Sequence, residues 1–355
     1  MSGFFEHTPE SLREWCVNHG MPSFTAKQIF DWVYAKQVVD PALMSNLSAN
    51  HRALLAEALP IDQGHLLADQ HASDGTRKLL VGWKDSSAGL PVLHEGPSTE
   101  TVLIPSDNRM TACVSSQIGC PVGCAFCASG IDGLEGNLSA GQIVEQVHRL
   151  SRLGLGRVTN VVFMGMGEPL ANFAAVTNAI TTLNASWGLG IGARKITVST
   201  IGLPEAIRRL AEFPLPITLA ISLHAPEDSL RRTLIPWAAH ASIPEILDAC
   251  RDYFDATGRE ITFEYLLLRG VNDRPHHARM LADLSSTVRC NINLIRYNEV
   301  PGLPFDRPSD VDVRIFQETL RDRRINAHIR ASRGRDIAAA CGQLRRAHTQ
   351  ADQST

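Results

Sequence analysis

Three cysteines lie close together in this 355-residue chain, at Cys120, Cys124 and Cys127. Their spacing, C-x₃-C-x₂-C, lets three thiolates hold three irons of one [4Fe–4S] cube, because cysteine thiolates are the usual ligands of such clusters. No fourth cysteine follows at ferredoxin spacing. The fourth iron would therefore stay open to a small molecule, which indicates chemistry beyond simple electron transfer.

Two other interpretations of these cysteines fit less well. A disulfide framework is unexpected, because the chain is large and shows no basic-then-apolar secretory leader. A structural zinc site needs four ligands, commonly from two closely spaced pairs. Only Cys124 and Cys127 form such a pair, and the nearest histidine downstream is His148. We therefore expect an iron–sulfur cluster.

The composition is that of a globular protein, with 44% hydrophobic and 20% charged residues. No apolar run reaches membrane-spanning length, so we expect no membrane association. Eight cysteines without a leader indicate a reducing cytoplasm. The net charge of −3 counts against a nucleic-acid binder that uses its whole surface. Eight arginines between Arg321 and Arg346 form either a solvated helix face or a phosphate-contacting strip, and their nearness to Cys341 favours the strip.

The chain divides into regions of different periodicity. Residues 1–62 predict a helical accessory domain, with helices over 9–16, 26–35 and 50–59 and Asn50 as an N-cap. Residues 63–105 predict a β-ribbon with turns at 73–75 and 85–87. In residues 106–346 strands and helices alternate, which favours a parallel sheet with covering helices. Six or seven such units are too few for a closed eight-stranded barrel, so we expect an α/β fold with a partial (β/α)6-type barrel, followed by a polar tail at 347–355.

Within the barrel, the expected elements are these. Strands are predicted at 112–115, 158–164, 195–199, 217–222, 261–267, 291–295 and 327–330. Helices are predicted at 140–153, 173–184, 204–213, 243–254, 275–284, 311–323 and 336–346. Ser139 is the expected N-cap of the first of these helices.

Polar and glycine residues gather where the predicted strands end, the edge at which parallel α/β folds bind ligands. A turn or a satisfied core polar group would explain any one of them, but together they indicate a shared ligand. Glycine allows close backbone approach, and a glutamate accepts hydrogen bonds from an ammonium group. The candidates are Gly167, Glu168, Ser199, Ser222, Leu223, His224 and Asn298.

The remaining cysteines are expected to be small buried hydrophobes at Cys16, Cys250 and Cys290. Cys113 and Cys341 are different, because each lies inside one of five distinctive segments. The segments are Thr101-Val-Leu-Ile-Pro105, Cys113-Val-Ser-Ser-Gln-Ile-Gly-Cys120, Met164-Gly-Met-Gly-Glu-Pro169, Ser222-Leu-His-Ala-Pro226 and Ala340-Cys-Gly-Gln-Leu344. Together they resemble the RlmN/Cfr family of radical S-adenosylmethionine (SAM) RNA methyltransferases. The resemblance runs from about Pro22 to Leu344.

The resemblance implies a radical SAM barrel in which Cys120, Cys124 and Cys127 hold a [4Fe–4S] cluster and the strand-end candidates bind SAM. It implies that Cys341 takes a methyl group from one SAM. A second SAM, cleaved at the cluster, supplies the radical that activates this methyl for attack on an adenine. Cys113 then displaces the product by forming a disulfide with Cys341, and Glu100 resembles the family's proton acceptor. A radical route suits carbon 2 of adenine, which is electrophilic.

The resemblance further implies 23S rRNA and tRNA as substrates, an electron donor such as flavodoxin or ferredoxin, and a cytoplasmic monomer. The segments Phe24–Trp32 and Ser332–Asp336 favour methylation of carbon 2. The chain departs from the family pattern at Thr25, Gly136 and Arg296. Three alternatives stay open: a Cfr-like enzyme that methylates carbon 8, a radical SAM enzyme with a small-molecule or peptide substrate, and a non-catalytic iron–sulfur or zinc-binding RNA module.

Overall fold

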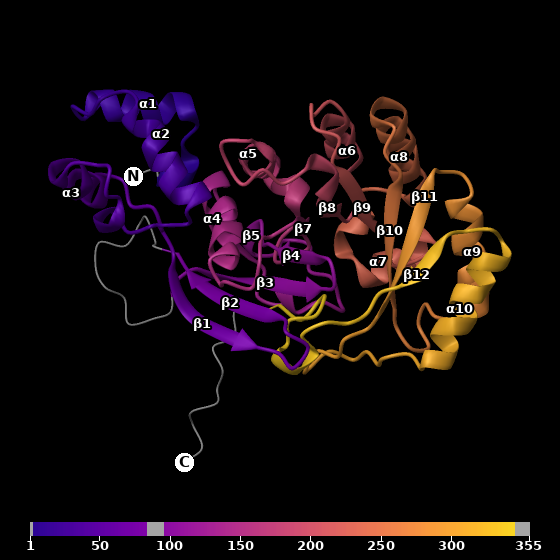
Figure 1. Ribbon diagram of the computed structural model, residues 1–355. Helices are drawn as coiled ribbons and strands as arrows, with labels where there is room; N and C mark the ends of the chain where they lie inside the picture. Colours follow the sequence, from indigo (N-terminus) through magenta and orange to yellow (C-terminus); the bar gives the residue numbers. More distant parts are fainter. Residues whose placement is uncertain (1–2, 84–95, 345–355) are drawn as a thin grey trace, which may run out of the picture.

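The computed structural model describes residues 3–83 and 96–344. Its main element is a ten-stranded sheet (Figure 1). The strand order is β1 (His65–His71), β2 (Arg77–Gly82), β3 (Ser98–Ser106), β4 (Arg109–Cys113), β7 (Asn160–Phe163), β8 (Ile196–Thr200), β9 (Thr218–Ser222), β10 (Ile261–Leu267), β11 (Cys290–Arg296) and β12 (Ala327–Ile329). A separate hairpin pairs β5 (Gln117–Gly119) with β6 (Leu134–Asn137).

Two kinds of pairing meet within this sheet. The strands from β4 to β12 pair in parallel with their neighbours, whereas β1 to β4 pair antiparallel. The parallel strands follow one another in chain order, so helical crossovers connect most neighbours, as a partial barrel requires. The ends of the sheet, β1 and β12, stay apart in the strand order. The predicted α/β fold with an open, mostly parallel sheet is therefore confirmed.

The helices lie between the strands and at the N-terminus. The α-helices are α1 (Pro9–Asn18), α2 (Thr25–Phe30), α3 (Ala49–Ala58), α4 (Ala140–Ser151), α5 (Phe173–Asn184), α6 (Pro204–Ala211), α7 (Asp228–Leu234), α8 (Ile243–Thr257), α9 (Pro275–Ser285) and α10 (Asp310–Asp322). A π-helix, η2 (Asp31–Ala35), continues α2. The short 3₁₀ segments are η1 (Phe4–Glu6), η3 (Pro41–Leu43), η4 (Ala128–Gly130), η5 (Pro169–Asn172), η6 (Ala193–Lys195), η7 (Pro236–Ala239) and η8 (Arg335–Ile337).

The helices α1 to α3 form a group at one end of the sheet, in indigo in Figure 1. Their starts follow capping chemistry. A capping box between Thr8 and Ser11 begins α1, and Ser48 begins α3 by accepting a hydrogen bond from His51 N (3.2 Å). The predicted cap Asn50 is therefore wrong, because a serine two residues earlier satisfies the free amides.

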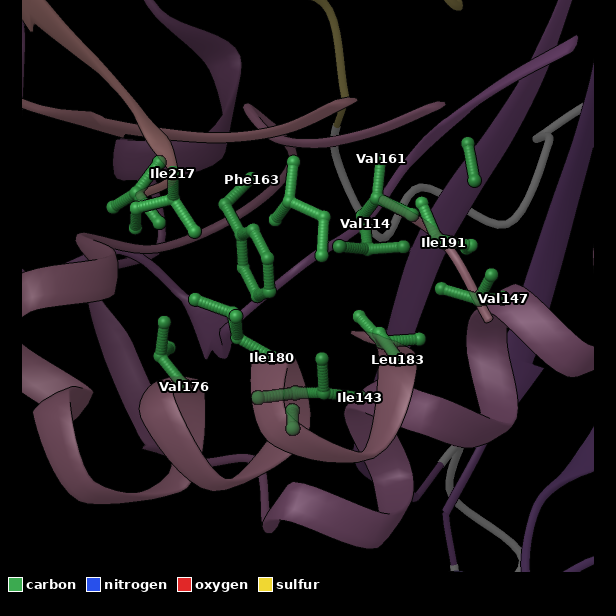
Figure 2. Close-up of a cluster of buried hydrophobic side chains, with 14 of the residues drawn as sticks. Val114, Ile143, Val147, Val161, Phe163, Val176, Ile180, Leu183, Ile191 and Ile217 are labelled. Atoms are coloured by element: carbon green, nitrogen blue, oxygen red, sulfur yellow. The ribbon is translucent and has the colours of Figure 1, made fainter. Parts of the chain in front are cut away.

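A hydrophobic core lies between the sheet and the helices α4 and α5, and it includes side chains of β7, one of the strands that lead to the candidate site. Figure 2 shows Ile143 and Val147 of α4 and Ile180 of α5 facing Val161 and Phe163 of β7. All five side chains are at most 1% exposed. Removal of this apolar surface from water stabilises the packing of these helices on the sheet. The predicted N-cap Ser139 is confirmed, since its hydroxyl accepts from Gln142 N (3.2 Å).

One further prediction is wrong, and two elements of the structure had no prediction. The helix predicted at 336–346 is wrong over the described residues, because only η8 forms there. Ala338 and Gly342 have φ values of 49° and 81°, in the left-handed region that interrupts a right-handed helix. The helix α7 and the β5–β6 hairpin were not predicted. The predicted turn at 85–87 lies outside the described residues, whereas the one at 73–75 is present. Among the described helices, none is long and apolar enough to span a membrane.

Candidate active site

The three-cysteine loop follows β5 and is fixed by main-chain hydrogen bonds. Cys120 N donates to Gly133 O (2.9 Å), and Ala128 N donates to Gly342 O (2.8 Å). The second bond ties the loop to the segment that carries Cys341. All three thiols of the loop are free of disulfides. The backbone therefore sets the shape of the loop and leaves its sulfur atoms available to a ligand.

A cavity of about 150 Å³ lies beside this loop, and we call it the first cavity. The predicted site residues that line it are Cys120, Cys124, Cys127, Gly167, Glu168, Ser199, Ser222, His224 and Cys341. Most of them come from the carboxyl ends of β7, β8 and β9, as the rule for parallel sheets predicts. Leu223 is fully buried and outside this lining, and Asn298 lines a second cavity instead.

The donor set of the loop fits an iron–sulfur cluster. Within the described residues, no three His, Cys, Asp or Glu side chains converge on a point that one metal ion could occupy. A cube has different needs, because each thiolate binds a different iron. Burial raises the pKa of Cys120 to about 11, with the neighbouring Cys127 and Glu168 adding to the rise. A bound metal reverses this effect, since a coordinating thiol is deprotonated.

Gly167 and Glu168 form the turn after β7. Gly167 has a φ of 101°, and a Cβ there would lie 2.6 Å from Gln117 Cβ, so only glycine fits. Glu168 is 2% exposed, and both of its carboxylate oxygens already accept main-chain hydrogen bonds. Oε1 accepts from Leu170 N and Oε2 from Ile201 N, each at 2.9 Å. Glu168 thus fixes the backbone of two strand ends around the cavity.

His224 is held in one tautomer. Its Nδ1 accepts a hydrogen bond from Leu266 N (3.0 Å), so the proton of the neutral ring is on Nε2. Burial lowers the pKa of His224 to about 3, and the charge of Arg231 adds to this effect. The ring packs edge-on against Phe126 of the cysteine loop, with ring centroids 5.1 Å apart. The site therefore holds a neutral imidazole with a fixed donor.

A second cavity adjoins the first. It is lined by Cys113, Asn298, Arg330 and Cys341, among others, and it shares Met164, Ile295 and Cys341 with the first cavity. Both cysteines are free thiols, so no standing disulfide joins them. Burial raises the pKa of Cys113 to about 12, whereas the guanidinium of Arg330 opposes the rise. The fold thus brings Cys113 and Cys341 to one cavity although they are 228 positions apart in the sequence.

Glu100 lies on β3, outside the linings of the two cavities. It is 3% exposed, and its Oε1 pairs with Lys78 Nζ at 2.7 Å. Ser115 Oγ donates to the Glu100 carbonyl (2.7 Å). The structure therefore places this predicted proton acceptor in a buried ion pair rather than in direct contact with either cavity.

Three polar residues that line the first cavity were not among the predicted site residues: Ser129, Thr200 and Glu264, the last from β10. A charged residue in the otherwise apolar run Ile261–Leu267 was the available signal. Arg330, predicted as part of a phosphate-contacting strip, instead pairs inward with Glu264 (Nη1 to Oε1, 3.3 Å). Arg323 pairs with Asp283, and Arg345 and Arg346 lie outside the described residues. The eight arginines therefore do not share one helix face.

Comparison with known proteins gives two family matches. A family model for the radical SAM superfamily matches residues 114–281, and one for the "Ribosomal RNA large subunit methyltransferase N-terminal domain" matches residues 4–61. The crystal structure of a radical SAM methyltransferase from Sphaerobacter thermophilus superimposes with a TM-score of 0.92 at 43% identity, covering 97% of this chain and 99% of that one.

Curated relatives extend over nearly the whole chain. A protein of Gloeobacter violaceus named "Probable dual-specificity RNA methyltransferase RlmN" is 44% identical over 338 residues, which are 95% of this chain and 93% of the relative. A protein of the same name from Clostridium perfringens is 42% identical over 349 residues and covers 98% of both chains. Family membership implies a [4Fe–4S] cluster and SAM as cofactors. The chain belongs to the RlmN family of radical SAM methyltransferases.

Proposed function

We propose that this protein methylates carbon 2 of a specific adenine in 23S rRNA and in tRNA, through a methyl-cysteine intermediate and with two molecules of SAM. The relatives named as dual-specificity RNA methyltransferases support RNA as the substrate class. The observation that carries the proposal is that Cys341 lines both cavities, between the cysteine loop on one side and Cys113 on the other.

In this proposal the first cavity is the cofactor site. Cys120, Cys124 and Cys127 hold the cluster, which when bound supplies the one-electron chemistry that cleaves SAM. The strand-end residues hold SAM, with Gly167 allowing close approach of the backbone. His224 Nε2–H offers a fixed donor. The apolar side chains of Val122, Phe126, Leu266 and Ile295, which also line the cavity, exclude water from the reacting groups.

The cysteines divide the remaining work. Cys341, as a thiolate, attacks the methyl carbon of SAM; its S–CH₃ bond forms as the bond to the sulfonium breaks, and the leaving sulfur keeps the electron pair. After the methyl carbon has been attached to the adenine, Cys113, as a thiolate, attacks the sulfur of Cys341. The S–S bond forms as the C–S bond breaks, and the released carbon keeps that electron pair and takes up a proton. Glu100 accepts a proton from the adenine intermediate, for which it must leave its pairing with Lys78 or act through an intervening group.

Mass spectrometry of nucleosides tests the whole proposal. Ribosomal RNA and tRNA from a strain lacking the gene should lose 2-methyladenosine, and the wild-type gene should restore it. Loss of 8-methyladenosine would instead identify a carbon-8 enzyme. Unchanged RNA from the deletion strain, together with RNA-independent turnover of SAM by the purified protein, would support a non-RNA substrate.

A further inference from the structure

A row of polar side chains crosses four neighbouring strands on one face of the sheet. Glu264 of β10 is in register with Ser222 of β9 and with Asn293 of β11, so these three side chains share a face. Ser199 of β8 continues the row, with its Oγ 3.3 Å from Ser222 Oγ. Ser199, Ser222 and Glu264 all line the first cavity.

Only one of the two carboxylate oxygens of Glu264 accepts hydrogen bonds from the protein. It is 3% exposed. Its Oε1 accepts from Asn293 Nδ2 (2.9 Å) and from Arg330 Nη1 (3.3 Å). Its Oε2 is buried and has no hydrogen-bond partner. A buried carboxylate oxygen without a donor destabilises a protein, so its persistence at a cavity wall points to a donor that arrives with a ligand.

Glu168 provides the internal contrast. It is equally buried and lines the same cavity, but main-chain amides occupy both of its oxygens. Glu264 is therefore the cavity carboxylate with an acceptor still to be filled. Burial raises the pKa of Glu264, and the charge of Arg330 opposes that rise.

We propose that Glu264 Oε2 accepts a hydrogen bond from a ribose hydroxyl of SAM, and that Asn293 and Arg330 are positioning residues that hold the other oxygen. The inference rests on the proposed function, in which SAM occupies the first cavity. With a cluster bound, its open iron would take the amino and carboxylate groups of SAM, and the sulfonium carries no donor. The ribose hydroxyls suit the row of two serines and Glu264, whereas the adenine ring suits the apolar wall.

Equilibrium binding to the anaerobically reconstituted holoprotein tests this assignment. Calorimetry compares SAM with two analogues in which the 2′- or the 3′-hydroxyl is replaced by hydrogen. Wild-type protein should bind one analogue roughly 10- to 100-fold more weakly than SAM, the range for a hydrogen bond to a charged group. In Glu264→Gln, Asn293 and Arg330 claim the amide oxygen, so the acceptor is lost. This variant should bind SAM more weakly and discriminate little against the same analogue.

If Arg330 positions the Glu264 carboxylate, its substitutions should change the discrimination between SAM and the analogue by degrees. Arg330→Met should reduce the discrimination between SAM and the analogue, and Arg330→Lys should restore part of it. Glu145→Gln is the matched control, because Glu145 is a buried carboxylate outside both cavities and should keep wild-type discrimination. Wild-type protein that binds both analogues as tightly as SAM overturns the inference, as does full discrimination by Glu264→Gln. The comparison of SAM with the two analogues on wild-type protein tests the inference even where a variant does not fold. The inference needs only one part of the proposed function, SAM in the first cavity, and failure of that part looks different, since the wild type would then bind neither SAM nor the analogues. Failure of the RNA substrate assignment would appear in the nucleoside analysis and leave SAM binding unchanged.

Discussion

Cys341 is one of three residues that line both cavities, and its surroundings differ on the two sides. One side holds the cysteine loop and the strand-end residues, and the other holds Cys113 and Arg330. The roles proposed for the single cysteines can be separated by substitution.

The first prediction concerns the three-cysteine loop. Cys124→Ala should lose most of the iron bound by anaerobically reconstituted protein, because one iron loses its thiolate ligand. Iron and sulfide analysis with visible absorption spectra measures the loss. Cys290→Ala is the control, since Cys290 lies outside both cavities and bonds to Ser285 O (3.4 Å). Wild-type iron content in Cys124→Ala, or zinc without iron in the native protein, would contradict the cluster.

The second prediction concerns Cys113 and Cys341. Cys113→Ala should accumulate protein covalently attached to RNA through Cys341, because the thiol that releases the product is missing. Denaturing electrophoresis of protein isolated from cells, with and without nuclease, detects the adduct. Cys341→Ala should form neither the adduct nor methylated adenine. Free methylated adenine made by Cys113→Ala at the normal rate, or an adduct in Cys341→Ala, would refute these roles.

Among the secondary-structure elements, those set by local sequence patterns were predicted best. The apolar run at 261–267 and the helix at 173–184 match β10 and α5 residue for residue. The segment 336–346 looked helical, yet it turns at Ala338, where the chain joins the cysteine loop through Gly342. Long-range interactions made there override local helix propensity. The proposed domain boundaries at residues 62, 105 and 346 stay a prediction. The β-ribbon and the barrel belong to one continuous sheet, because β3 pairs with β4.

The candidate site shows the same limit. The cysteine spacing and the strand-end residues are local patterns, so the sequence was enough to select most of the polar residues that line the first cavity. Glu264 depends on strand register, which decides that its carboxylate faces Ser222 and Asn293. Arg330 depends on the pairing of β12 with β11. No spacing in the sequence indicates either interaction.

The third prediction concerns three arginines of the predicted phosphate-contacting strip. Replacing Arg323, Arg324 and Arg345 together with glutamine should weaken RNA binding and flatten its salt dependence, by roughly one unit of slope for each phosphate group that the variant no longer binds. Binding titrations over a range of salt concentrations measure the slope. Arg251→Gln is a matched control, because Arg251 and Arg323 are both 44% exposed and each pairs with an aspartate. An unchanged slope in the triple variant would show that these arginines do not contact RNA phosphates.

At the scale of the whole molecule, the N-terminal helices are joined to the barrel through α4. His148 Nε2 donates to Val33 O (2.8 Å), and the ring packs against Phe5 with centroids 5.0 Å apart. Gly141 N donates to Glu6 Oε1 (2.8 Å). A fully buried histidine at this junction makes the stability of the whole molecule depend on pH.

The fourth prediction follows from that histidine. Burial lowers the pKa of His148 from 6.5 to about 4, so between these values the unfolded chain binds a proton that the folded chain does not. The contribution of His148 is therefore complete above pH 6.5 and is lost as the pH falls, by about 2 kcal/mol at pH 5. Urea unfolding of wild-type protein and His148→Gln at pH 7 and pH 5 measures it. The side-chain amide of glutamine can still donate to Val33 O but does not titrate, and cluster effects common to both proteins cancel. The variant should lose less stability than the wild type between the two pH values. An equal loss would show that protonation of His148 does not change the free energy of unfolding.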